Sequence, residues 1–435
     1  MFYKKFFIAT IILLASAQSS ATSLRVNLLQ PYDTLIRPRM HECSRFQISL
    51  FGERGIRSAQ GYDTCGHRVN TLKIWDVCSA CDRGLLPRGS ISCDQDALAM
   101  LCGFPEGSEI DKFKTMLNAD NDGVRGHLCV TGDLELNGAF AFSAAVRFLD
   151  YFRFAAYLPV YSMELKNVRW CDKTKDITPA DMRVKEDLTG SLFDVVRNLG
   201  YGLDLCGWKR TGLGDLALFV EGSKDFKQMR PFLKNVRVNG RIGLSLPTGL
   251  REDEDKTFAI PFGYDGSVGI IWGGGLDLTF GCYFKMGFDV QLTHLFGNTR
   301  CRRIKTDEKQ TELLLLQKVD SYIDWGLTQR FNLYVELYKL FGGFSLLAGY
   351  QFIRNGDDDS AFANCTFSNE VASTARSLEE STMHQIVLNA SYDIADHLCE
   401  DARIKPYVSV FARIPVMGRN AALIPTVGAV VSFDF

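Results

Sequence analysis

The last ten residues of the chain alternate between apolar and polar side chains, and this restricts the folds open to them. One set holds Val427, Ala429, Val431, Phe433 and Phe435, whereas the other holds Thr426, Gly428, Ser432 and Asp434. Successive side chains of a β-strand point to opposite faces, so such a strand can present one face to lipid and the other to water. The pattern predicts a strand of a transmembrane β-barrel, with an edge strand of a soluble β-domain as the alternative.

The same alternation recurs along most of the chain, with charged side chains confined to one face. Phe284, Met286 and Phe288, for example, alternate with Lys285 and Asp289. A soluble β-sandwich has the same period, but segments near ten residues fit the thickness of a membrane. We expect strands at 45–54, 128–147, 152–165, 212–220, 235–246, 267–279, 284–296, 331–340, 344–354, 384–394, 403–414 and 424–435. The predicted fold is all-β, an up-and-down antiparallel barrel of about twelve strands, within a range of roughly ten to fourteen.

The connections between these strands alternate in length. Long connections fall at 55–127, 166–211, 247–266, 297–330, 355–383 and 415–423, and short ones at 148–151, 221–234, 280–283, 341–343 and 395–402. An even barrel with both termini in the periplasm has long outer loops and short periplasmic turns. Residues 321–329 keep the phase of the strand at 331–340, and they either lengthen it or form another strand.

The N-terminus has the features of a secretory signal peptide. Lys4 and Lys5 precede a ten-residue apolar run at 6–15, and small residues follow at 15–17 and 19–21. A membrane anchor is the alternative, but it needs roughly 20 apolar residues. We therefore expect a cleaved signal peptide at 1–21, a periplasmic N-terminal segment at 22–44, and a barrel at 45–435 with a cysteine-rich outer loop at 55–127.

The expected location is the outer membrane of a Gram-negative-type bacterium. An alternating apolar segment that ends on an aromatic residue, here Phe435, resembles the C-terminal signal of outer-membrane proteins. The expected partners are outer-membrane lipid, the barrel assembly machinery and small-molecule solutes. A net charge of −2 gives no support for a nucleic-acid partner.

Two short motifs resemble a known family. Gly212-Leu213-Gly214-Asp215-Leu216 is followed further along the chain by Gly243-Leu244-Ser245-Leu246-Pro247-Thr248-Gly249. The pair is similar to outer-membrane transporters of aromatic meta-pathway clusters, within the FadL-like group. The resemblance covers roughly 212–296 and implies a twelve-stranded channel for small apolar or aromatic solutes. The cysteines and the terminal Phe give a weaker resemblance to cysteine-rich major porins of the chlamydia type.

Thirteen cysteines follow the expected signal peptide. Seven of them are candidates for disulfides in or beside the first long loop, namely Cys43, Cys65, Cys78, Cys81, Cys93, Cys102 and Cys129. An exported protein meets an oxidising environment, so we expect disulfides that cross-link loops with little hydrophobic core of their own. The odd count leaves at least one thiol free or paired with another chain, and the sequence does not give the connectivity.

The Cys78-Ser79-Ala80-Cys81 motif has two further interpretations. Together with Cys93 and Cys102 it could hold zinc, and as a Cys-x-x-Cys motif it could be redox-active. No second Cys-x-x-Cys and no thioredoxin-like βαβ pattern accompanies it. We therefore favour disulfides, and we expect no metal and no cofactor.

The lumen is the candidate functional surface, because charged side chains facing lipid would cost about 2–4 kcal/mol each at the membrane midplane. The phase of the strands points fourteen charged candidates inward: Arg45, Arg147, Arg153, Asp215, Arg237, Arg241, Asp277, Lys285, Asp289, Glu336, Asp393, Arg403, Lys405 and Arg413. Rings of charge can set ion preference in a channel, whereas internal ion pairs can simply fill a barrel. Both interpretations stay open from the sequence.

Catalysis has little support, because the six histidines are scattered and no Ser/His/Asp grouping appears. We expect a channel that takes up small solutes passively, including hydrophobic or aromatic ones, and not an enzyme. The alternative is a structural envelope protein that is cross-linked through disulfides to itself or to other envelope proteins.

Overall fold

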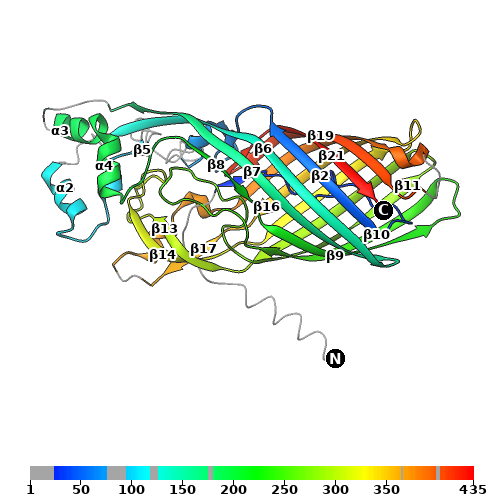
Figure 1. Ribbon diagram of the computed structural model, residues 1–435. Helices are drawn as coiled ribbons and strands as arrows, with labels where there is room; N and C mark the ends of the chain where they lie inside the picture. The colour runs from blue at the N-terminus through cyan, green and yellow to red at the C-terminus, as the bar shows by residue number, and fades with distance from the viewer. Residues whose placement is uncertain are drawn as a thin grey trace.

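Twelve long strands dominate the computed structural model, which describes residues 24–75, 95–117, 126–174, 179, 181–363, 366–397 and 402–435. Within these residues, the twelve strands form one closed antiparallel barrel (Figure 1). They are β2 (Phe46–Gly55), β6 (His127–Leu149), β7 (Phe152–Asp172), β9 (Leu216–Lys227), β10 (Leu233–Leu246), β11 (Gly269–Phe280), β12 (Phe284–Leu295), β15 (Thr328–Leu337), β16 (Phe344–Asn355), β18 (Ser381–Asp393), β19 (Lys405–Arg419) and β21 (Thr426–Asp434). Each pairs with the next, and β21 also pairs with β2, which closes the barrel.

The predicted fold class is therefore confirmed, and each of the twelve predicted strands has its counterpart. The largest differences lie at strand ends. β15 begins at Thr328, and β9 continues to Lys227. The segment at 321–329, for which the sequence leaves two interpretations, divides between two strands. Its first part belongs to β14 (Gln317–Asp324), a separate strand outside the barrel, and its last part belongs to β15.

The outer surface of the barrel is apolar. Its exposed side chains include Leu50, Phe142, Val238, Ile242, Phe288, Leu333, Ile386, Leu388, Val410 and Val431. The residues that alternate with them are polar and buried, as Ser49, Gln291 and Gln351 show. An exposed apolar surface of this extent is unfavourable in water and is typical of the lipid-facing wall of a membrane barrel. We therefore treat the barrel as membrane-spanning.

Small elements lie at the end of the barrel that carries the long connections, which we call the outer end (Figure 1, left). A four-stranded sheet contains β1 (Arg25–Val26), β20 (Ala421–Leu423), β3 (Gln60–Tyr62) and β4 (Arg68–Val69), and a three-stranded sheet contains β13 (Asn298–Ile304), β14 and β17 (Asp359–Phe362). β5 (Gln95–Asp96) pairs with β6, and β8 (Trp208–Leu213) pairs with β7. The helices are η1 (Thr71–Lys73), η3 (Ala99–Leu101), α2 (Glu109–Leu117), α3 (Asp181–Lys185), η4 (Glu186–Gly190), α4 (Leu192–Leu199), α5 (Asn369–Ala372) and η5 (Arg376–Leu378), while η6 (Ile394–His397) lies in a turn at the opposite, periplasmic end.

The outer loops share a hydrophobic core. Leu98, Met100, Leu188, Val196 and Leu314 come from three different loops and are buried in one cluster. The expectation that these loops have little core of their own is therefore wrong for the described residues. The short apolar run at 313–316, which is too short to span a membrane, contributes Leu314 and Leu316 to this core. No helix in the described part of the chain is both long and apolar enough to cross a membrane.

Candidate functional site: the lumen and the segment that fills it

Residues 24–41 run through the lumen from one end of the barrel to the other (Figure 1, dark blue). At the outer end, β1 pairs in parallel with β20. At the periplasmic end, the backbone N–H of His41 donates to Asp434, which is the last residue of β21, at 2.6 Å. We call residues 24–41 the lumen segment. The structure thus places residues 24–41, which belong to the periplasmic segment expected at 22–44, inside the barrel. Residues 1–23, with the expected signal peptide, lie outside the described part.

The lumen segment has no periodic pattern that would reveal its position. Pro31 and Pro38 prevent a regular strand, since proline cannot donate a ladder hydrogen bond. A turn begins near Asp33, whose carboxylate accepts the backbone N–H of Leu35 at 3.1 Å. Leu29, Leu35 and Ile36 are almost completely buried against the barrel wall. The segment is thus packed into the lumen by apolar side chains as well as by polar ones.

Near the outer end, the lumen segment is held mainly by hydrogen bonds that involve backbone groups. Asn27 accepts the N–H of Ile424 at 2.7 Å and donates to its carbonyl at 2.9 Å, and it also donates to Gln385 at 3.1 Å. Arg413 donates to the carbonyl of Leu28 at 3.2 Å. These contacts join the segment to β18, β19 and the residue after β20.

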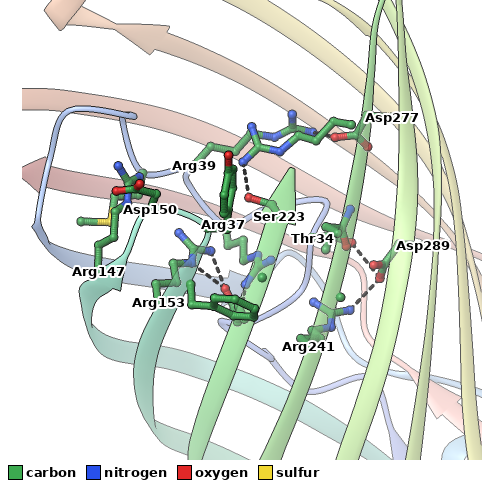
Figure 2. Close-up of a pocket in the computed structure, with 18 of the residues that line it drawn as sticks. Thr34, Arg37, Arg39, Arg147, Asp150, Arg153, Ser223, Arg241, Asp277 and Asp289 are labelled. Atoms are coloured by element: carbon green, nitrogen blue, oxygen red, sulfur yellow. Dashed lines mark hydrogen bonds and ion pairs between the residues drawn. The ribbon is translucent and has the colours of Figure 1, made fainter. Parts of the chain in front are cut away.

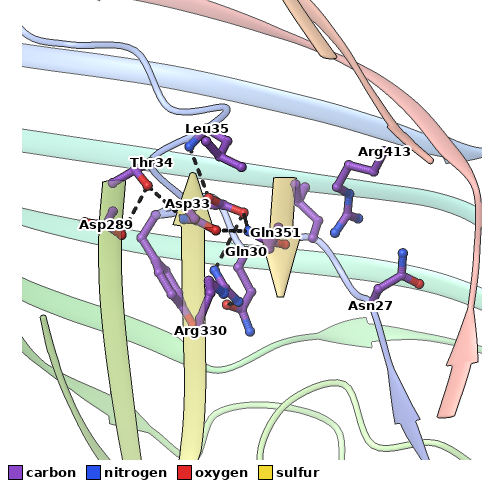
Figure 3. Close-up of polar contacts among 12 residues, drawn as sticks. Asn27, Gln30, Asp33, Thr34, Leu35, Asp289, Arg330, Gln351 and Arg413 are labelled. Carbon is purple, nitrogen blue, oxygen red and sulfur yellow. Dashed lines mark hydrogen bonds and ion pairs between the residues drawn. The ribbon is translucent and has the colours of Figure 1, made fainter. Parts of the chain in front are cut away.

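In the middle of the barrel, Asp33 and Thr34 contact the inner faces of neighbouring strands (Figure 3). Gln351 donates to the Asp33 carboxylate at 2.6 Å, and Arg330 forms an ion pair with it at 3.7 Å. Thr34 donates to Asp289 at 3.2 Å. Each partner is a buried polar group of the wall, and the segment adds a contact to those that Asp289 and Gln351 make with neighbouring strands.

Near the periplasmic end, a cavity lies beside the segment and is densely charged (Figure 2). Its lining includes Arg37 and Arg39 from the lumen segment, and Arg147, Asp150, Arg153, Glu221, Arg237, Arg241, Asp277 and Asp289 from the barrel. Arg37 forms an ion pair with Glu221, and Arg39 contacts Asp277 at 2.9 Å. The barrel contributes four arginines and four acids to this lining, so the two extra positive charges belong to the segment.

The fourteen predicted lumen residues occupy different environments. Six line this cavity: Arg147, Arg153, Arg237, Arg241, Asp277 and Asp289. Lys285 and Glu336 form a pair at 2.9 Å on adjacent strands, Asp393 lies 3.3 Å from His41, and Arg413 pairs with Glu53 at 2.5 Å. Asp215 belongs to an outer turn described below, Lys405 is the first residue of β19, and Arg45 and Arg403 are exposed beyond the strand ends.

Several charged residues of the lumen are absent from the sequence-based set. Glu53 keeps the inward phase of Gln47 and Ser49, so the alternation could have revealed it. Glu221 and Arg330 were missed because the predicted strands end at 220 and begin at 331, one residue short in each case. Asp33, Arg37 and Arg39 lie in the irregular lumen segment and carry no periodic signal.

The two motifs behind the family resemblance contact each other at the outer rim. Thr248 donates to the carbonyl of Gly214 at 3.0 Å and accepts the N–H of Leu216 at 2.9 Å. Asp215 accepts the N–H of Gly249 at 2.9 Å. A Cβ atom on Gly214 would lie 2.7 Å from the carbonyl oxygen of Phe262, so only glycine fits there. The motifs therefore fasten the β8–β9 turn to the 247–268 loop, and one residue of each, Asp215 and Ser245, also lines a cavity beside the lumen segment.

A second charged cluster lies in the outer loops. Arg300 contacts Asp265 at 2.5 Å, and Arg302 contacts the same carboxylate at 3.2 Å. Glu252 lies 3.8 Å from Arg300, and the backbone N–H of Glu252 donates to Asp265 at 3.0 Å. Burial, followed by the negative charge of Asp265, raises the pKa of Glu252 to about 8, against the opposing effect of the arginines.

The raised pKa of Glu252 predicts pH-dependent stability of the outer loops. A carboxyl group with a folded pKa above its ordinary value stabilises the folded state below that ordinary value, and this contribution is lost as pH rises through about 8. We expect proteolysis of the outer loops to be at least about threefold faster at pH 9 than at pH 6, normalised to an unfolded peptide. Glu252→Gln should flatten this dependence, and an unchanged dependence would exclude Glu252 as its source.

The cysteines correct part of the disulfide prediction. Cys43, Cys102 and Cys129 are free thiols, whereas Cys65 is disulfide-bonded. Cys78, Cys81 and Cys93 lie outside the described residues, as do the zinc and redox interpretations that depend on them. Asp63, Cys65 and His67 lie close enough to share a metal ion, but a disulfide sulfur is not a thiolate ligand. The shared hydrophobic core holds the described parts of these loops together at Cys102 and Cys129, where the expected cross-links are absent.

No family model and no curated protein matches the sequence. Solved structures with similar folds include an outer membrane channel from Pseudomonas putida F1, with a TM-score of 0.46 and 10% identity over 94% of this chain and 100% of that one. A FadL homologue from Pseudomonas aeruginosa has a TM-score of 0.28 and 8% identity, over 96% and 98% of the two chains. The toluene transporter TodX from Pseudomonas putida has a TM-score of 0.27 and 8% identity, over 96% of both chains. One of these structures is a FadL homologue, and its likeness to this chain concerns the barrel fold alone.

Proposed function

We propose that this protein is a passive outer-membrane channel for small solutes, and that the lumen segment closes it until the segment leaves the barrel. The observation that carries this proposal is the polar inner wall behind the segment. Its buried side chains include Ser49, Gln291, Asn332, Gln351, Gln385, Asn389, Ser409 and Ser432. A wall of amides and hydroxyls can hydrogen-bond to water once the segment is gone, as a water-filled passage requires.

The apolar outer surface and the closed set of strands support a location in the outer membrane of a Gram-negative-type bacterium. Barrels of this kind depend on an assembly machinery, which is the expected partner during insertion, and on outer-membrane lipid afterwards. The wall itself has no edge through which another chain could join the sheet.

The lumen favours solutes that carry polar groups. Around the charged cavity the barrel itself contributes equal numbers of arginines and acids, so the open channel should have a weak preference between cations and anions. Tyr157 and Phe219 lie face to edge inside the barrel, with ring centroids 5.9 Å apart. An aromatic ring with a polar substituent fits both this lining and the aromatic solutes that the motif resemblance implies.

A sealed structural barrel is the second candidate, because the segment occupies the whole length of the lumen. Recording from planar bilayers separates the two functions. We expect the refolded full-length chain to give brief, discrete openings from a closed baseline, as the segment leaves and returns. Inserted protein that stays silent at every voltage, with its folded state shown by heat-modifiable migration on a gel, would favour the sealed barrel.

A further inference from the structure

The hairpin of β6 and β7 brings two cysteines together above the membrane. Both strands are longer than a membrane requires, and their outer parts extend beyond the rest of the barrel (Figure 1). In the register of this pair, Cys129 lies directly opposite Cys171. Directly opposite residues of antiparallel strands point to the same face. Cys171 is exposed and Cys129 is partly exposed, and both are thiols.

The spacing of the two strands is close to that of a disulfide. The N–H of Lys173 donates to the carbonyl of His127 at 2.7 Å, so these opposite residues form a hydrogen-bonded pair. Cys129 and Cys171 are two positions further along and belong to the same type of pair, for which the Cα atoms are about 5.5 Å apart. Disulfides span Cα separations of roughly 4.4–6.8 Å. The Cβ atoms of such a pair lie about 5.5 Å apart, whereas a disulfide needs roughly 3.5–4.5 Å, so the two strands must approach by about 1 Å for the bond to form.

A basic side chain singles out one of the two thiols. The ammonium group of Lys73, at the end of η1, lies 3.0 Å from the sulfur of Cys129. This ammonium group donates to the Cys129 sulfur, so that sulfur has a charged hydrogen-bond donor beside it when it attacks a disulfide. Cys206 in another outer loop has the opposite surroundings, because burial and the neighbouring Asp204 raise the pKa of its thiol.

We propose that Cys129 and Cys171 are an oxidisable pair that closes into a cross-strand disulfide, with Cys129 as the attacking thiol and a small-molecule disulfide as the oxidant. The Cys129 thiolate attacks one sulfur of the oxidant, which forms a mixed disulfide and releases one thiolate. The Cys171 thiol then gives up its proton and attacks the Cys129 sulfur, which releases the second thiolate. Two protein thiols are oxidised, and one small disulfide is reduced to two thiols.

The bond would fasten the outer end of the hairpin. β5 pairs with β6 next to Cys129, and the chain after Cys171 continues towards α3 and α4. The disulfide would therefore link the residues at which the loop before β6 and the loop after β7 join the barrel. This role is intramolecular, and it differs from cross-linking between envelope proteins.

Peptide mapping of the full-length refolded protein tests the pairing. The protein is reduced, freed of reductant, and treated with oxidised glutathione at pH 8 before digestion with trypsin without reductant. We expect peptides 126–147 and 170–173 to appear joined through their single cysteines. Persistence of both thiols after Cys206 has reacted would overturn the proposal, and so would Cys129 joined to a different cysteine.

Three variants test the roles of the residues. Cys171→Ser should trap the mixed disulfide of glutathione on Cys129, because the second step is lost. Lys73→Met should slow the reaction of Cys129 by about threefold or more and leave the rate at Cys206 unchanged. Cys206→Ser is the matched control and should form the joined peptides at the wild-type rate. An unchanged Cys129 rate in Lys73→Met would remove Lys73 from the mechanism.

Discussion

Deletion of residues 24–39 is expected to turn a mostly closed barrel into a steadily open one. The time-averaged conductance per inserted molecule in planar bilayers should rise at least about tenfold over the full-length chain. The reason is that the deletion removes all but the last two residues of the lumen segment and leaves every barrel strand intact, since β2 begins at Phe46. It also removes Arg37 and Arg39, so the cavity keeps only the balanced charges of the wall.

A milder variant tests the role of the lumen segment even if the deletion variant does not fold. Arg37→Ala combined with Arg39→Ala removes the ion pairs to Glu221 and Asp277 but keeps the rest of the segment. We expect more frequent openings of the same amplitude as in the wild type. Arg45→Ala is the control, because this arginine is exposed outside the barrel wall. A deletion variant that folds and inserts but stays silent would show that something other than the segment closes the lumen.

The barrel could be predicted because its strands obey a rule that acts on each residue separately. Lipid on one side and polar groups on the other impose a period of two, so β12 is visible from Phe284, Met286 and Phe288 alone. The short turns and the long outer loops then follow from the order of the strands. The strand ends were less accurate, because the alternation fades where β9 and β15 leave the membrane.

The lumen segment could not be predicted in this way, because its position depends on contacts between residues far apart in the sequence. Asp33 contacts Gln351 and Arg330, and Arg37 contacts Glu221, only after the barrel has closed. No local sequence pattern indicates these long-range contacts. The thiols show the same limit, since the pairing of Cys129 with Cys171 comes from the strand register and not from their spacing in the chain.

Replacement of Arg413 by methionine is expected to destabilise the barrel by about 3–5 kcal/mol, as measured by urea unfolding in lipid vesicles. Arg413 donates to Glu53 through Nε at 2.7 Å, and the two side chains are 4% and 0% exposed. The variant leaves the carboxylate of Glu53 buried without its cation, which costs more than the pair itself contributes. Arg419→Ala, at an exposed position of the same strand, should change the stability by less than about 0.5 kcal/mol.

The double variant Arg413→Met with Glu53→Gln separates stability from closure. Removing both charges should restore most of the unfolding free energy, because no buried charge is left alone. It should not restore closure, because Arg413 also donates to the carbonyl of Leu28 in the lumen segment, and that contact stays lost. We therefore expect a barrel of nearly wild-type stability with a raised frequency of openings. If the double variant instead closed as tightly as the wild type, the contact between Arg413 and Leu28 would have no part in holding the segment.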